Sequence, residues 1–152
     1  MKLAEALVQR ADLQKRIEQI RQRLKRSALV QEGEQPPENP GELLAEVERL
    51  LGELTSLIGR INRTNLATQL ADGTTLTDAL ARRDTLALHY SILEDLATAA
   101  SVELNRYSRA EIKSFPTIQV SAVRQQMDTL AQQRRELDTA IQATNWTVDL
   151  AE

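Results

Sequence analysis

The sequence predicts a mainly α-helical protein: a long-helix antiparallel bundle with coiled-coil-like seams and a small β-hairpin element. Apolar residues recur at alternating spacings of three and four over long segments. Leu, Ala, Gln, Glu and Arg dominate, and only Tyr90, Tyr107, Phe115 and Trp146 are aromatic, a composition typical of long helices. The 152-residue length favours a single domain over residues 1–152.

The first two helices are predicted over about residues 2–31 and 41–64. One seam comprises Leu3, Ala6, Arg10, Leu13, Ile17, Ile20 and Leu24. Glycine and proline in residues 32–38 break the first helix. Asn39 is a good N-cap for the second helix, with Pro40 at its first position. The second seam comprises Leu43, Val47, Leu50, Leu54, Leu57 and Ile61. A further stripe at Leu44, Leu51 and Ile58 widens the apolar face, which predicts contact with more than one helix.

A β-hairpin is predicted over residues 65–76, where Leu66, Thr68 and Leu70 alternate with other residues before the turn dipeptide Asp72-Gly73. Residues 112–119 are predicted to be extended and could pair with this hairpin. The third helix is predicted over 77–107, capped by Thr77, and the fourth over 120–147.

The charge layout favours a helical hairpin in the N-terminal half. Residues 1–31 carry eight basic and three acidic side chains, a net charge of +5, and residues 32–59 carry one basic and seven acidic side chains, a net charge of −6. A basic helix followed by an acidic one gives complementary flanks. We therefore expect this charge to pair within the chain, with no nucleic acid partner.

The sequence offers little catalytic chemistry. It has no cysteine, and His89 is its only histidine, so we expect no metal site, no cofactor and no enzymatic activity. No stretch reaches the length of a membrane span. Acidic residues at Glu5 and Asp12 interrupt any signal-peptide apolar region, so a cytoplasmic location is expected.

Arg10, Arg83 and Arg134 occupy positions in otherwise apolar seams. A buried guanidinium needs a carboxylate or an exit to water. Asp84, Glu94, Asp128, Glu136 and Asp138 are available as partners. Two interpretations stay open: ion pairs that set the register of the helices, or an anion-binding cleft at the bundle axis.

Two polar clusters also require explanation. The run Asn62-Arg63-Thr64-Asn65 could cap the second helix or contact a ligand or subunit. Asn145-Trp146 could anchor the chain end against a partner surface. Together with the arginine and acid positions, the candidate ligand or subunit contacts are Asn62, Arg63, Asn65, Arg83, Asp84, Arg134, Arg135, Glu136, Asp138, Asn145 and Trp146.

The same clusters carry a family resemblance over nearly the whole chain. The motifs are Ile61-Asn62-Arg63-Thr64-Asn65, Asp72-Gly73-Thr74-Thr75-Leu76-Thr77, Ala81-Arg82-Arg83-Asp84, Arg135-Glu136-Leu137-Asp138, Ile141-Gln142 and Asn145-Trp146. In these the chain resembles the septicolysin-like bacterial family of unknown function. The resemblance implies a helical protein with a short β insert and no established enzymatic activity. The family name implies a cytolysin.

The sequence thus favours a non-enzymatic helical-bundle protein that assembles as a homo-oligomer in a structural or interaction role. The alternatives are a membrane-active, cytolysin-like protein and a binder of small anionic ligands at the arginine and acid clusters.

Overall fold

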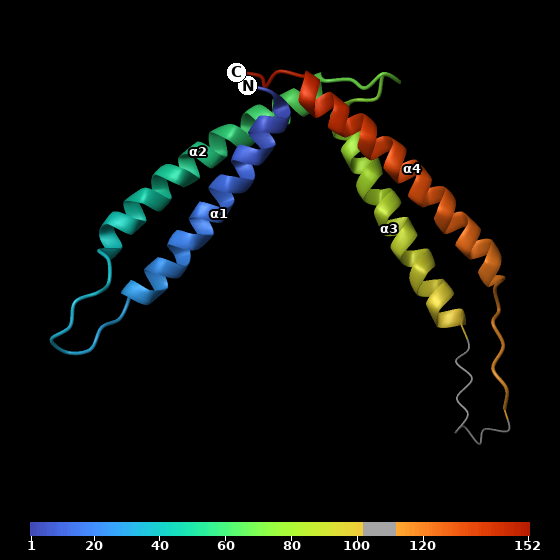
Figure 1. Ribbon diagram of the computed structural model, residues 1–152, viewed down its shortest axis with the longest axis horizontal. Coiled ribbons are helices and arrows are strands. Elements are labelled where there is room, and N and C mark those ends of the chain that lie inside the picture. Colours follow the sequence, from blue (N-terminus) through green and yellow to red (C-terminus); the bar gives the residue numbers. More distant parts are fainter. Residues whose placement is uncertain (102–111) are drawn as a thin grey trace. The chain divides into compact units, whose positions relative to one another are not determined.

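The computed structural model describes residues 1–101 and 112–152, and these form four helices: α1 (Leu3–Ser27), α2 (Pro40–Ala67), α3 (Leu76–Ala100) and α4 (Val120–Thr147). Helix α1 lies beside α2, and α3 lies beside α4 (Figure 1). The mainly α prediction is confirmed, with helices packed as in a bundle. The chain divides into two compact units, residues 1–69 with 142–152 and residues 70–141. The single domain and the antiparallel bundle stay predictions.

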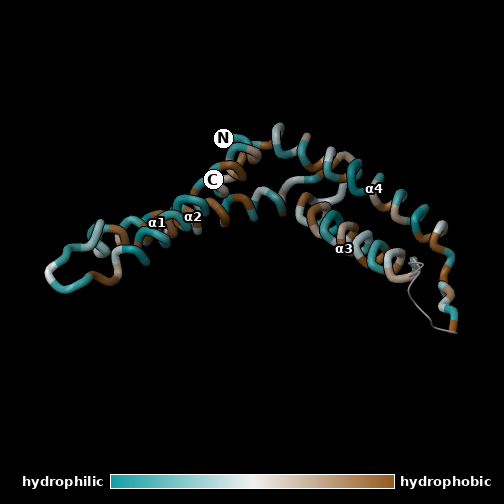
Figure 2. The backbone as a smooth tube through the Cα atoms, turned by 60° about the horizontal axis from the view of Figure 1, so that its bottom comes forward, coloured by the Kyte–Doolittle hydropathy of each residue, from teal (hydrophilic) through white to brown (hydrophobic). Residues whose placement is uncertain are grey.

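In the first unit, buried positions recur every seven residues along both α1 and α2. They are Ala6, Leu13, Ile20 and Ser27 on α1, and Leu43, Leu50, Leu57 and Thr64 on α2. Seven residues make about two helical turns, so these side chains share one face. Figure 2 shows the resulting alternation of polar and apolar positions along the helices. The additional stripe on α2 remains largely outside this core, since Leu44 and Leu51 are exposed.

The predicted charge complementarity appears as ion pairs in the first unit. Arg23 Nε donates to Glu38 Oε2 at 2.8 Å, and Arg16 lies 3.8 Å from Glu46. Arg23, near the end of α1, therefore contacts Glu38, whereas Arg16, earlier in α1, contacts the later residue Glu46. All four side chains are partly exposed, so water screens the pairs and they contribute more to register than to stability.

The second unit has one layer of core side chains between α3 and α4. Leu93, Ala97, Met127 and Leu130 are its buried members. The half-buried side chains packed against them are Leu86, Tyr90, Val120 and Val123. This layer lies between the two helices and does not cover the sides of α3 and α4 that face away from each other.

The β-hairpin predicted over residues 65–76 is wrong. Helix α2 continues to Ala67, and the next residues form a tight turn in which the Leu70 N–H donates to the Thr74 carbonyl at 2.8 Å. Gly73 has φ of +84°, which a residue with a side chain rarely adopts. Leu66 is exposed near the end of α2, whereas Leu70 is buried in the turn that follows. The alternating residues 66–70 therefore belong to a helix end and a turn.

Several element boundaries also differ from the prediction. Helix α1 ends at Ser27, four residues early, and α3 begins at Leu76 with Thr75 as its cap. Residues 112–119 contain neither helix nor strand, so their predicted pairing with a hairpin is wrong. Helix α3 ends at Ala100, and residues 102–107 of the predicted third helix lie outside the described residues.

Candidate functional site

Several of the predicted contact residues lie in two clusters, one in each unit. We call the first the terminal joint. It consists of residues 1–3, residues 148–152 and the α2 segment 60–64. We call the second the arginine groove, between α3 and α4.

The two chain ends pair in the terminal joint. Lys2 and Asp149 form an isolated antiparallel bridge. The Leu3 N–H donates to the Val148 carbonyl at 3.0 Å, and the Leu150 N–H donates to the Met1 carbonyl at 2.9 Å. The Lys2 ammonium lies 2.9 Å from Asp149 Oδ1, and this hydrogen bond lowers the pKa of the Asp149 carboxyl.

Helix α2 holds the last two residues of this segment. The buried Thr64 Oγ1 accepts a hydrogen bond from the Ala151 N–H at 2.9 Å. Arg60 Nε donates to the Ala151 carbonyl at 2.8 Å, and Arg63 Nη2 donates to the Glu152 carbonyl at 2.7 Å. The predicted polar run therefore fixes the C-terminal segment. Sequence reasoning missed Arg60 as a contact, and it considered Thr64 only as a member of the polar run.

The remaining predicted residues of the first unit have different exposure. Asn62 is exposed and Asn65 half-buried on α2. Asn145 is buried, whereas the side chain of the adjacent Trp146 is 61% exposed. Trp146 therefore stays accessible to a partner, while Asn145 belongs to the interior of the unit.

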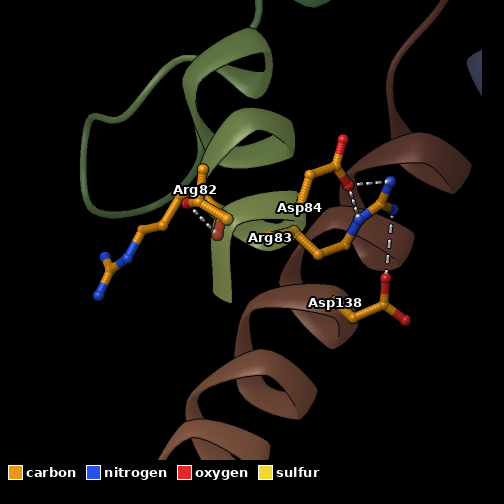
Figure 3. Close-up of polar contacts among 5 residues, drawn as sticks. Arg82, Arg83, Asp84 and Asp138 are labelled. Atoms are coloured by element: carbon orange, nitrogen blue, oxygen red, sulfur yellow. Dashed lines mark hydrogen bonds and ion pairs between the residues drawn. The ribbon is translucent and has the colours of Figure 1, made fainter. Parts of the chain in front are cut away.

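In the second unit, Arg83 lies between two carboxylates. Its Nη1 is 3.4 Å from Asp138 Oδ1 on α4, and its Nη2 is 3.4 Å from Asp84 Oδ1 on its own helix. Figure 3 shows the guanidinium directed toward both acids, with Arg82 pointing away from them. This contact joins α3 to α4, as the ion-pair interpretation of the seam arginines requires.

The arginine groove beside this pair has a volume of about 570 Å³. Its lining residues are Arg83, Asp84, Tyr90, Leu130, Ala131, Arg134, Arg135 and Asp138. Arg134 is exposed, although it was predicted within a seam. Of the predicted residues nearby, Glu136 lies outside the lining and accepts a hydrogen bond from Gln132 at 3.0 Å. Sequence reasoning missed Tyr90, Leu130 and Ala131, whose place depends on how α3 and α4 are rotated.

The groove has a surplus of positive charge. Three guanidinium groups and two carboxylates line it, which leaves a formal charge of +1. Within residues 1–101 and 112–152, neither Arg134 nor Arg135 forms an ion pair. The groove can therefore offer two guanidinium groups to an anion, together with the apolar side chains of Leu130 and Ala131.

Residues 1–101 and 112–152 contain neither a metal-binding cluster nor a helix that could span a membrane. No group of three or more His, Cys, Asp and Glu side chains in that part of the chain could hold a metal ion. None of the helices that the structure describes has a stretch apolar and long enough to cross a bilayer.

Comparison with known proteins gives two matches. A family model described as "Family of unknown function (DUF6847)" matches residues 10–150. A crystal structure of a functionally unknown conserved protein from Corynebacterium diphtheriae is 44% identical, with a TM-score of 0.93 over 99% of this chain and 98% of that chain. No curated protein matches the chain.

The resemblance to the septicolysin-like family is wrong. A model of a different family matches residues 10–150, and the structural neighbour is of unknown function. The alternative of a membrane-active, cytolysin-like protein rested in part on that family name and is not favoured by these matches. The chain belongs to the family of unknown function DUF6847.

Proposed function

We propose that this chain is a non-enzymatic interaction protein that associates with a second copy of itself. The observation that carries the proposal is a row of large apolar side chains on the outer face of α3. Leu88 is 61% exposed, Ile92 56% and Leu96 40%. They follow one another at a spacing of four residues and therefore share one side of the helix.

The architecture of the second unit supports this proposal. A helix stabilises a domain by burying its apolar stripe against another element. Helix α3 already uses Leu93 and Ala97 for its contact with α4, so the exposed row is a second apolar face. Single exposed apolar residues are ordinary on protein surfaces, but contiguous rows mark interaction sites.

The polar clusters support a role without catalysis. Arg60, Arg63 and Thr64 hold the C-terminal segment, and Arg83 joins α3 to α4. Each of these side chains has a structural contact, and that contact explains why a polar or charged residue occupies the position.

Light scattering of the full chain over a range of concentrations tests the proposal. We expect a mass above that of the 152-residue monomer that rises with concentration. A strict monomer at micromolar concentration and above would contradict it.

A second candidate function, binding of a small organic anion in the arginine groove, is favoured by one observation. Arg134 and Arg135 line the groove without an ion pair among the described residues, beside Leu130, Ala131 and Tyr90. Guanidinium groups suit carboxylate and phosphate, and small-molecule sites are commonly about 300–1,000 Å³. An anion with an apolar body would place its charged group at these arginines and its body against the apolar side chains.

Titration with phenyl phosphate and with benzoate, followed by calorimetry, tests this candidate. R134Q/R135Q should weaken binding. D138N should strengthen it, because Arg83 then loses a competing carboxylate. R124Q is the matched control, since Arg124 is an exposed arginine of α4 outside the groove. Equal weakening by R124Q would show that the anion binds the general surface charge.

A further inference from the structure

The arginine groove interrupts the apolar seam between α3 and α4. On α4, the seam side chains on either side of the groove are buried or half-buried: Met127, Leu130, Leu137 and Ile141. Arg134 occupies the seam position between them and is exposed. On α3, the half-buried Arg83 lies in the seam between the buried Ala79 and the half-buried Leu86. The apolar seam is therefore broken at the groove, where charged side chains replace apolar ones.

An ion pair between the helices explains one of the three arginines that line the groove. Arg83 joins α3 to α4 through Asp138. Arg134 and Arg135 are exposed, and within residues 1–101 and 112–152 neither has an ion-pair partner. Two unpaired positive charges on neighbouring residues repel each other, and an anion bound by both would offset this repulsion.

We propose that the arginine groove binds a phosphate monoester that carries an aromatic ring. This inference rests on the anion-binding candidate function and names the class of its ligand. A phosphate monoester has a charge of about −1.5 to −2 at pH 7 and three acceptor oxygens. It can therefore neutralise both Arg134 and Arg135 and accept hydrogen bonds from each. A carboxylate has one charge and two oxygens, which a single bidentate guanidinium satisfies.

The two acids of the groove orient this ligand. Asp84 and Asp138 flank Arg83 (Figure 3), so this side of the groove carries one positive and two negative charges, a local net charge of −1. A dianion is repelled from this side and attracted to the two unpaired guanidinium groups. The phosphate therefore lies at Arg134 and Arg135, with the rest of the ligand directed along the groove.

Tyr90 offers the aromatic ring of the ligand a surface in the same groove. It is half-buried, packs against the core of the second unit, and lines the groove together with Leu130 and Ala131. Aromatic rings attract each other in offset-stacked or edge-to-face geometry, in addition to the area they bury. The groove volume of about 570 Å³ lies within the range of about 300–1,000 Å³ that is common for small-molecule sites.

Calorimetric titration of the full chain with three small anions tests the ligand class. The titrations are made at about pH 8, where phosphate monoesters are dianions. Benzenesulfonate has the ring and three oxygens of phenyl phosphate but only one charge. We expect phenyl phosphate to bind at least about tenfold more tightly, the usual effect of one lost charge-assisted hydrogen bond. Methyl phosphate keeps the dianion without the ring, and we expect it to bind about fivefold more weakly than phenyl phosphate.

Variants assign the two preferences to residues. R134Q and R135Q, made separately, should each reduce the preference for phenyl phosphate over benzenesulfonate, because the dianion then meets one unpaired guanidinium. R124Q should keep this preference, since Arg124 is an exposed arginine of α4 outside the groove. Y90L should remove the preference for phenyl phosphate over methyl phosphate, whereas Y90F should keep it. Circular dichroism of each variant checks that the helices are retained.

The outcomes separate this inference from the candidate function on which it rests. If none of the three anions nor benzoate binds to the folded chain, both are wrong. If benzenesulfonate binds as tightly as phenyl phosphate, the groove is an anion site but not one for a dianion. Equal binding of methyl phosphate and phenyl phosphate would overturn the aromatic part of the proposal. Loss of the dianion preference in R124Q would show that it comes from the general surface charge and overturn the assignment to the groove.

Discussion

At the residue scale, the contact between Arg23 and Glu38 connects the last part of α1 to the loop that follows it. The side-chain hydrogen bond from Arg23 is the main cause that lowers the pKa of the Glu38 carboxyl. A carboxyl with a lowered pKa in the folded state stabilises the fold above its unfolded pKa. This contribution is lost as the pH falls through the folded pKa.

Replacement of Glu38 by Gln tests whether the Glu38 carboxylate stabilises the fold at neutral pH and loses that contribution at low pH. We expect E38Q to lower the urea midpoint at neutral pH, where the carboxylate of the parent chain is ionised. The difference from the parent chain should vanish below the lowered pKa of Glu38. E48Q is the control, because Glu48 is an exposed α2 carboxylate without an ion pair to a described residue. An equal loss of stability at both pH values would contradict the prediction.

The start of α3 gives a second test at the residue scale. Thr75 Oγ1 accepts from the Asp78 N–H at 3.1 Å and donates to Asp78 Oδ2 at 2.8 Å. T75A should therefore lower the free energy of unfolding by about 1 kcal/mol, the typical value of an N-cap. T77A should cost much less, because Thr77 lies inside the helix. Urea denaturation of both variants distinguishes them, and a larger loss in T77A would place the cap where the sequence suggested it.

At the element scale, the apolar periodicity predicted the long helices but not their ends. The seams of α1 and α2 are buried or half-buried as predicted, because a seven-residue repeat places side chains on one helix face whatever lies at its termini. The last turns of α2 also have partners that are distant in sequence. Arg60, Arg63 and Thr64 contact Ala151 and Glu152, and no local pattern in residues 61–70 reveals that contact.

The same reason limits prediction of the arginine groove. Arg83, Asp84 and Asp138 could be grouped from the sequence, because a seam arginine needs an acid and these acids were in reach. The apolar lining could not be assigned. Which apolar side chains border the groove, such as Tyr90 and Leu130, depends on the rotation of α3 against α4.

Replacement of Thr64 by Val tests the terminal joint. The Thr64 hydroxyl bonds both the Ala151 N–H and the Arg60 carbonyl. T64V should lower the free energy of unfolding by about 1 kcal/mol, the usual net value of such a hydrogen bond. It should also speed amide exchange at Leu150.

T55V is the matched control for this variant, since among the described residues the Thr55 hydroxyl bonds only the Leu51 carbonyl of its own helix. If T64V and T55V gave the same exchange rate at Leu150, the hydroxyl of Thr64 would have no part in holding the C-terminal segment.

At the scale of the whole molecule, the chain has few aromatic residues and its cores are small. In the second unit the buried layer consists of Leu, Ala and Met side chains between two helices. Small cores leave a chain marginally stable, and association with a second copy adds buried apolar area. The exposed row on α3 is therefore expected to contribute to the stability of the assembly rather than to that of the single chain.

This expectation predicts a concentration-dependent thermal midpoint. An association that favours the folded state stabilises it by mass action, so the midpoint of the parent chain should rise with protein concentration. L88Q/I92Q should lose most of that rise, yet match the parent chain at the lowest concentration, because both side chains are largely exposed within one copy. L44Q/L51Q should keep the rise. Thermal melts followed by circular dichroism measure all three. A rise that persisted in L88Q/I92Q would show that the stabilising contact lies elsewhere on the chain.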